Sequence, residues 1–180
     1  LFRSTFVQLE AEFQSSFDMT VIDLPRHILV NYPQLITNVN VIVLVAELTL
    51  ASARDAIRLL SWLKSHSPTA QVIVVTNKVP STPGEIGSAD FEASIERKID
   101  LSLPFDSKGA SHAAKLGQTF AETNKTSKAG TALRDLAQLV VGNSQPSNGD
   151  TPAKTGLLGK FDFKSLLAKK DKAVPAKTGR

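Results

Sequence analysis

The chain has 180 residues, 42% of them hydrophobic, with no cysteine and only three histidines, which are spread along the sequence. This composition excludes a disulfide scaffold and argues against a structural zinc site, since both need Cys or His side chains in suitable clusters. The longest apolar run, residues 41–46, is far shorter than the roughly 20 residues of a membrane-spanning helix. Of the formal net charge of +4, residues 1–150 carry −2 and residues 151–180 carry +6, so the basic character belongs to the tail.

The first residues show neither an initiator Met nor a signal-peptide pattern, and we expect the chain to be a fragment. Apolar residues at helical spacing predict a helix over residues 1–14. Four β-branched runs then predict strands, over residues 19–22, 41–45, 71–75 and 99–103. The middle two runs are apolar on both faces, as parallel strands covered by helices are, whereas the fourth alternates and is expected nearer an edge.

Helical patterns separate these strands. The clearest covers residues 50–63, with Thr49 as its N-cap and Ser67-Pro68 at its end, which predicts a strand–helix–strand crossover. Further helices are predicted over residues 33–38, 88–98, 108–116 and 127–141. The alternation predicts an α/β fold, with a mostly parallel sheet flanked by helices.

The composition changes after Gly142. We predict an α/β domain over residues 1–142, a flexible linker over 143–156 and a basic tail over 157–180. Six lysines surround apolar residues in the tail, but Phe163, Leu166 and Leu167 fall largely on the opposite side of a helix from the earlier apolar residues. Two alternatives are therefore equally open. The tail docks on an anionic membrane or a partner, or it is a disordered basic tail.

Polar side chains follow each predicted strand, at the sheet edge where open parallel sheets bind ligands. Asp23 suits a role beside Mg²⁺, because hard cations prefer carboxylate oxygen, but the motif by itself favours a cap of the turn before Pro25. Asn77 could read an adenine edge with its amide or cap the following loop. Arg26 and His27 could contact phosphate, although a solvated loop is the simpler interpretation.

Four segments together resemble the CpaE/TadZ family, pilus-assembly relatives of the MinD and ParA ATPases. They are Ile-Asp-Leu-Pro-Arg-His at 22–27, the stretch 47–60, Val-Thr-Asn-Lys-Val at 75–79, and residues 98–106 with Leu-Pro-Phe-Asp at their end. The resemblance covers about residues 15–142. It implies a partial P-loop NTPase fold, with ATP and Mg²⁺ as cofactors of the intact protein.

The resemblance also implies roles for single residues. Asp23 is similar to the aspartate that positions Mg²⁺ and the attacking water, and Pro25 to the residue that shapes the switch turn. Asn77 is similar to a base-contacting asparagine, and Pro104, Phe105 and Asp106 resemble the loop that closes over adenine. Glu47 lies where relatives form part of a nucleotide-dependent dimer face.

The sequence departs from the family at one important point. The Gly-rich phosphate loop with its lysine is missing, since no Gly-Lys pair is followed by Ser or Thr. We therefore expect the 180-residue chain neither to hydrolyse ATP nor to bind it tightly by itself.

Three functions follow from these observations. The first is a cytoplasmic ATPase part that positions a pilus or secretion machine as a homodimer, with peripheral contact at the inner membrane or cell pole through its tail. The second is a localisation scaffold of the same fold without turnover. The third, a partition-type nucleic-acid-associated protein, is disfavoured by the net charge of −2 over residues 1–150.

Overall fold

The computed structural model describes residues 2–80 and 85–144, all within one compact unit, Leu1–Pro146. The elements follow in the order α1 (Phe2–Ser16), α2 (Arg26–Asn31), a 3-10 turn η1 (Pro33–Ile36), β1 (Val41–Ala46), α3 (Leu50–His66), β2 (Gln71–Val79), α4 (Ser88–Ile95), β3 (Leu101–Pro104), α5 (Ser107–Leu116), α6 (Phe120–Thr123) and α7 (Lys128–Ser144). The predictions for residues 145–180 lie outside the described residues. Helix α7 ends at Ser144, two residues after the last residue of the predicted domain.

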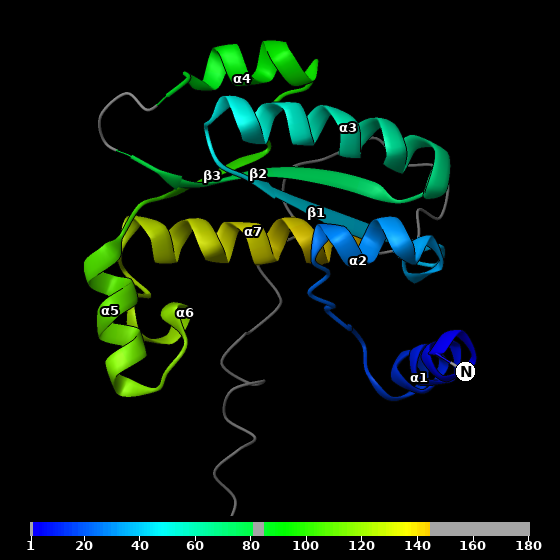
Figure 1. Cartoon of the computed structure of the whole chain (residues 1–180). Helices are drawn as coiled ribbons and strands as arrows, with labels where there is room; N and C mark the ends of the chain where they lie inside the picture. The colour runs from blue at the N-terminus through cyan, green and yellow to red at the C-terminus, as the bar shows by residue number, and fades with distance from the viewer. Residues whose placement is uncertain (1, 81–84, 145–180) are drawn as a thin grey trace, which may run out of the picture. The chain divides into compact units, whose positions relative to one another are not determined.

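The three strands form one parallel sheet in the order β1-β2-β3, so the predicted α/β architecture is confirmed. The register pairs Val41 with Gln71 and Val75 with Leu101. Helices α3 and α4 cover one face of the sheet and α7 covers the other (Figure 1). Among the described strands β2 is central, as its apolar sequence predicts, and β3 is at an edge as expected. In the described part of the chain β1 is also an edge strand, although it is apolar throughout.

The main core lies between the sheet and the α3–α4 layer. Phe91 and Val74 are completely buried there, together with residues of β1 and of both helices. A second cluster joins Leu29 of α2, Ile36 of η1 and Leu63 of α3 at the β1 side of the sheet. Because α2 packs there, it fastens the segment before β1 to the domain.

Helix α3 begins and ends where its sequence indicates. The side-chain oxygen of Thr49 accepts a hydrogen bond from the backbone N–H of Ser52 at 3.1 Å, so the predicted N-cap is confirmed. Ser67 is the C-cap, and its buried hydroxyl donates to the carbonyl oxygen of Ile36 at 2.9 Å. This bond ties the end of the helix to η1, and the chain then enters β2.

The strand predicted over residues 19–22 is not present. These residues have no regular structure, and Val21 is 82% exposed. A strand needs a neighbour for its backbone hydrogen bonds, and no described strand pairs with this segment. A run of β-branched residues alone is therefore not enough to form a strand at residues 19–22.

The boundaries of β3 and α4 also differ from prediction. Strand β3 begins at Leu101 rather than Ile99, because the carboxylate of Asp100 accepts the N–H of Val74 at 2.7 Å and takes a place in the ladder. Helix α4 ends at Ile95 because Glu96 adopts a left-handed conformation, with φ of 54°. Helices α2 and α6 were not predicted. They are short, and α6 is held by a capping box of Thr119 and Glu122.

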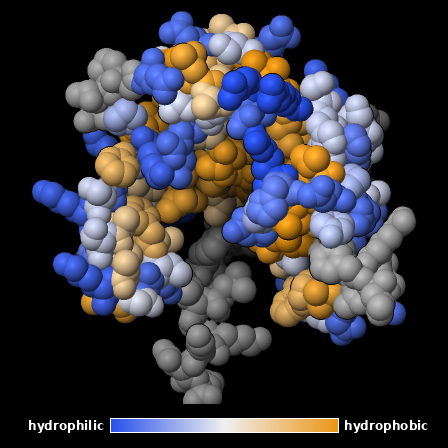
Figure 2. Space-filling view, in the orientation of Figure 1, coloured by the Kyte–Doolittle hydropathy of each residue, from blue (hydrophilic) through white to orange (hydrophobic). Residues whose placement is uncertain are grey.

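Apolar side chains reach the surface in the middle of the view in Figure 2, at the level of the sheet. The exposed large apolar residues include four between α1 and α2 and one of β1, namely Phe17, Met19, Val21, Ile22 and Val45. No helix of the described residues is both long and apolar enough to cross a bilayer.

Candidate functional site at the carboxyl edge of the sheet

The carboxyl ends of the three parallel strands lie at one edge of the sheet. Glu47 directly follows β1, Asn77 and Lys78 lie near the end of β2, and Phe105 follows β3. The backbone N–H of Phe105 donates to the carbonyl oxygen of Val79 at 3.0 Å, which holds the two loop ends together. The structure thus brings predicted residues from three successive strands to the same edge.

Lys78 has an unusual backbone for a strand residue. Its φ is +53°, a left-handed conformation that costs a non-glycine residue energy. The pairing of β2 with β3 is irregular at this point, between Thr76 and Val79. The side-chain oxygen of Asn77 accepts the N–H of Lys78 at 2.8 Å and so stabilises this bulge.

Lys78 also joins the ends of two strands. Its ammonium forms an ion pair with the carboxylate of Glu47 at 2.8 Å, and both side chains are about half exposed, at 57% and 50%. At such exposure the pair adds little stability, about 0–1 kcal/mol. Its main effect is to place a cation and an anion together at this edge. Sequence reasoning did not identify Lys78, although a lysine beside a capping asparagine at a strand end is a detectable pattern.

The sequence left two alternatives for Asn77, a contact with an adenine edge and a cap of the following loop. Its Oδ1 caps the bulge, which is the local role. Within the described residues its Nδ2 makes no hydrogen bond, so the donor half of the amide is available to a ligand. Beneath it, the hydroxyl of buried Thr76 is hydrogen-bonded to Ser102 at 2.8 Å, which links β2 to β3.

The segment Pro104-Phe105-Asp106 connects β3 to α5. Pro104 ends the strand opposite Val79, and Phe105 is 59% exposed. Asp106 is the N-cap of α5, and its Oδ1 accepts the N–H of Gly109 at 2.8 Å. Any larger residue in place of Gly109 would collide with this carboxylate, because an added Cβ would lie 2.7 Å from Asp106 Oδ2. Asp106 therefore has a structural role in addition to the predicted ligand role.

Asp23 and Pro25 lie in the irregular stretch before α2. Both are exposed, and Pro25 is the residue that precedes the first turn of the helix. No group of three or more His, Asp or Glu residues that could hold a metal ion occurs among the described residues. Asp23 alone is an incomplete Mg²⁺ site, so the described residues do not fit a bound magnesium ion without further ligands.

Arg26, predicted to lie in a solvated loop, begins α2 and pairs with Asp55 of α3. The hydrogen bond from Arg26 holds the pKa of the Asp55 carboxyl below its usual range, and Asp55 in turn raises the pKa of Arg26. The pair connects α2 to α3 next to the cluster around Leu29 and Leu63. Sequence reasoning missed Asp55, because nothing local indicates which helix residue faces Arg26.

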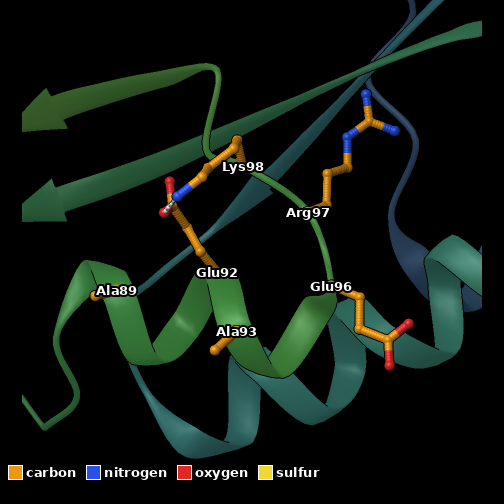
Figure 3. A pocket seen from close by; sticks show the side chains of 6 residues that line it. All are labelled: Ala89, Glu92, Ala93, Glu96, Arg97 and Lys98. Carbon is orange, nitrogen blue, oxygen red and sulfur yellow. Dashed lines mark hydrogen bonds and ion pairs between the residues drawn. The ribbon is translucent and has the colours of Figure 1, made fainter.

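A surface pocket of about 390 Å³ lies at the opposite, amino edge of the sheet (Figure 3). Three of its four charged side chains, those of Glu92, Arg97 and Lys98, are engaged within the fold. Glu92 pairs with Lys98 at 2.7 Å and accepts the N–H of Ile99 at 3.0 Å, while Arg97 donates to the carbonyl oxygen of Val72. These contacts lower the pKa of Glu92, chiefly through the hydrogen bond from Lys98. The pocket residues thus connect α4 to the start of β3, at the opposite edge of the sheet from the predicted site residues.

Solved structures show which class of fold this is. The chain is similar to a ParA family ATPase from Chlorobium tepidum TLS, with 22% identity, a TM-score of 0.53 and coverage of 62% of this chain and 45% of that one. It is also similar to the MinD cell division protein of Aquifex aeolicus, with 19% identity, a TM-score of 0.60 and coverage of 76% and 58%. No family model and no curated protein matches the sequence.

These likenesses define the fold. The chain has part of the α/β fold of the MinD and ParA proteins, and it spans about half the length of those two structures.

Proposed function

We propose that the chain is part of a MinD/ParA-type ATPase of the CpaE/TadZ kind, which positions a pilus or secretion machine through nucleotide-dependent dimerisation. One observation carries this proposal. Three successive parallel strands bring Glu47, Asn77 and Phe105 to the carboxyl edge of a MinD/ParA-like sheet, which is where open parallel sheets bind ligands. The four family-like segments also occur in the expected order.

In this proposal the edge of the sheet holds the base of ATP. The Nδ2 of Asn77, which makes no hydrogen bond within the described residues, donates to the base, and Pro104, Phe105 and Asp106 form the loop beside it. The exposed ring of Phe105 offers an apolar surface for stacking, since aromatic rings stack on bases. Glu47 contributes to a dimer face of two copies. Asp23 and Pro25 act at the phosphate side, where residues outside this chain must supply the remaining Mg²⁺ ligands.

The wider setting is proposed on the same basis. The protein works in the cytoplasm, as a homodimer together with pilus or secretion proteins. Peripheral contact with the inner membrane or cell pole is made through the basic residues 157–180, seven of which are Lys or Arg. Nucleic acid is not expected as a partner, because residues 1–150 carry a net charge of −2.

A titration of the 180-residue chain with ATP, followed by backbone amide NMR, tests the base site. We expect weak binding at millimolar ATP, with shifts at residues 76–79 and 104–107 and little change with GTP. Asn77→Asp is a matched variant, because it keeps an oxygen for the Lys78 N–H but removes the amide donor. Loss of the ATP shifts in this variant supports the proposal. Equal shifts with GTP, or none at these residues, contradict it.

ATP turnover must be measured on the intact native protein. Asp23→Ala is expected to abolish phosphate release, whereas Asp18→Ala, which removes a nearby exposed carboxylate, leaves it unchanged. If the intact protein shows no turnover but still localises its machine, the second candidate holds, a scaffold of the same fold.

A further inference from the structure

Asn124 connects three helices at one point. It is the C-cap of α6, where its backbone N–H donates to the carbonyl oxygen of Phe120 at 3.0 Å. Its side-chain Nδ2 donates to the carbonyl oxygen of Gly109 in α5 at 3.2 Å, across 15 positions of the sequence. Its own carbonyl oxygen accepts the N–H of Ser127, in the turn that leads into α7, at 3.0 Å. Asn124 therefore links the first turn of α5 to the junction between α6 and α7.

Gly109 is held on both sides of its Cα. Its N–H donates to Oδ1 of Asp106 at 2.8 Å, and its carbonyl oxygen accepts from Asn124. The space around it is filled, because an added Cβ would lie 2.7 Å from Asp106 Oδ2 and 2.8 Å from Asn124 Oδ1. Asp106 belongs to the segment 104–106 that leads from β3 into α5. The amide of Asn124 and the cap residue of that segment thus act on the same buried glycine.

The other end of this connection is fixed to the sheet. Helix α7 covers one face of the sheet (Figure 1) and packs on β3. Arg134 in α7 donates to the carbonyl oxygen of Lys125 at 2.9 Å, which holds the turn directly after Asn124. On the strand side, the N–H of Phe105 donates to the carbonyl oxygen of Val79 at 3.0 Å. The start of α5 is therefore held by two elements, by β2 through Phe105 and by α7 through Asn124.

We propose that Asn124 is a positioning residue of the base site, which keeps the segment 104–106 in place at the carboxyl edge of the sheet. The inference rests on the proposed function, since it gives Asn124 a role in nucleotide binding. Phe105 is 59% exposed, so packing within the described residues does little to position it. Its place depends on the backbone on both sides, and on the helix side that backbone is held by Asp106, Gly109 and Asn124.

The first test is the titration of the 180-residue chain with ATP, followed by backbone amide NMR. Asn124→Ala should remove most of the ATP shifts at residues 104–107 and retain those at 76–79, because β2 does not depend on Asn124. The Kd measured at residues 76–79 should rise about fivefold, the usual effect of one lost hydrogen bond. Asn124→Gln keeps an amide donor and should restore part of the shifts at residues 104–107.

A control variant separates positioning from a general loss of stability. Thr119→Ala removes the capping box of α6 and so destabilises the same helix, but it leaves the bond between Asn124 and Gly109 in place. It should lower the melting temperature and still show the ATP shifts of the unchanged chain. Equal loss of the shifts at residues 104–107 in Thr119→Ala and Asn124→Ala would overturn the positioning role, because stability alone would then explain it.

A measurement without nucleotide distinguishes this inference from the proposed function. The N–H groups of Gly109 and Ala110 donate to Asp106, and their hydrogen exchange in the free chain should be faster in Asn124→Ala than in Thr119→Ala. If exchange is unchanged in Asn124→Ala, or if its ATP shifts at residues 104–107 persist, the inference fails while the base site stands. If the unchanged chain shows no ATP shifts, the base site fails and the role of Asn124 fails with it.

Discussion

Gly130 lies in the first turn of α7, where the carbonyl oxygen of Asn124 comes very close to its Cα. An added Cβ would lie 1.8 Å from that oxygen, a distance that no side chain can accept without backbone movement. The contact exists because the chain folds back from α6 into α7, and Ser127 caps the turn by accepting the Gly130 N–H at 3.0 Å. A glycine is needed here for space rather than for backbone conformation.

We predict that Gly130→Ala lowers the free energy of unfolding by about 1–3 kcal/mol, the usual cost of overpacking. Gly142→Ala is the matched control, because Gly142 is also in α7 and an added Cβ meets nothing within 4 Å. That variant should be neutral or more stable by up to about 1 kcal/mol, since Ala favours helix. Urea unfolding followed by circular dichroism measures both. Equal effects of the two variants would show that the close approach to Asn124 is not present in solution.

Glu92 gives a prediction for pH. Its pKa is lowered by the hydrogen bond from Lys98 and then by the N–H of Ile99. A carboxyl with a lowered folded-state pKa stabilises the fold at pH values above its unfolded pKa, about 4.3, and loses this effect as pH falls through the folded value. The unchanged protein should therefore melt at a higher temperature than Glu92→Gln at neutral pH. The difference should shrink as pH falls from about 5 to about 3. Glu96→Gln removes a neighbouring acid at the same helix end and serves as the control.

At the scale of single elements, α5 depends on its cap. Asp106 precedes the helix and accepts the N–H of Gly109 at 2.8 Å, and Gly117 ends it in a left-handed conformation with φ of 63°. The carboxylate also interacts favourably with the positive end of the helix dipole. The same residue is proposed to lie beside a nucleotide, so its two roles must be separated by substitution.

We predict that Asp106→Ala lowers stability by about 1 kcal/mol, whereas Asp106→Asn retains most of it, because Asn is an equally good N-cap. Thermal unfolding of the two variants measures the capping role. If Asp106→Ala is as stable as the unchanged protein, the cap contributes nothing. ATP shifts at residues 104–107 in the stable Asp106→Asn variant then report the ligand role alone.

At the scale of the whole molecule, the outer edge of β1 is the part of the described structure most prone to self-association. The strand is apolar over all six residues, yet in the described sheet it pairs on one side only. Val45 is 56% exposed in this strand, and Val21 before α2 is 82% exposed. An apolar edge strand is a template for pairing with other chains, so we expect the chain to self-associate with rising concentration.

Val45→Lys should reduce this self-association while changing the free energy of unfolding by less than about 0.5 kcal/mol, because the side chain is on the surface. Leu44→Lys, one residue earlier, is the contrasting variant. Leu44 is only 9% exposed and belongs to the main core, so a buried unpaired charge there should unfold the domain. Light scattering over a concentration series measures the first effect and circular dichroism the second. Unchanged scattering by Val45→Lys would show that β1 is not the associating edge.

The residues at the carboxyl edge were only partly predictable. Asn77, Glu47 and Phe105 could be placed there because polar residues follow strongly apolar strands and parallel strands end at one edge. The role of Lys78, next in the same strand, could not be predicted, because it depends on a left-handed backbone and on a carboxylate 31 positions away. Asp55 was missed for the same reason, since its partner Arg26 belongs to another helix.

Elements with strong local signals could be predicted from the sequence alone. Strands β1 and β2 follow from continuous apolar runs, and α3 follows from its apolar spacing and from Thr49, whose cap involves a residue only three positions away. The other features depend on contacts that form only in the folded chain. Residues 19–22 have strand composition but no partner strand, and the start of β3 is set by a bond between Asp100 and Val74. Helical turns and caps are made within a few residues, whereas strand pairing, ion pairs and bulges depend on neighbours that only the folded chain brings together.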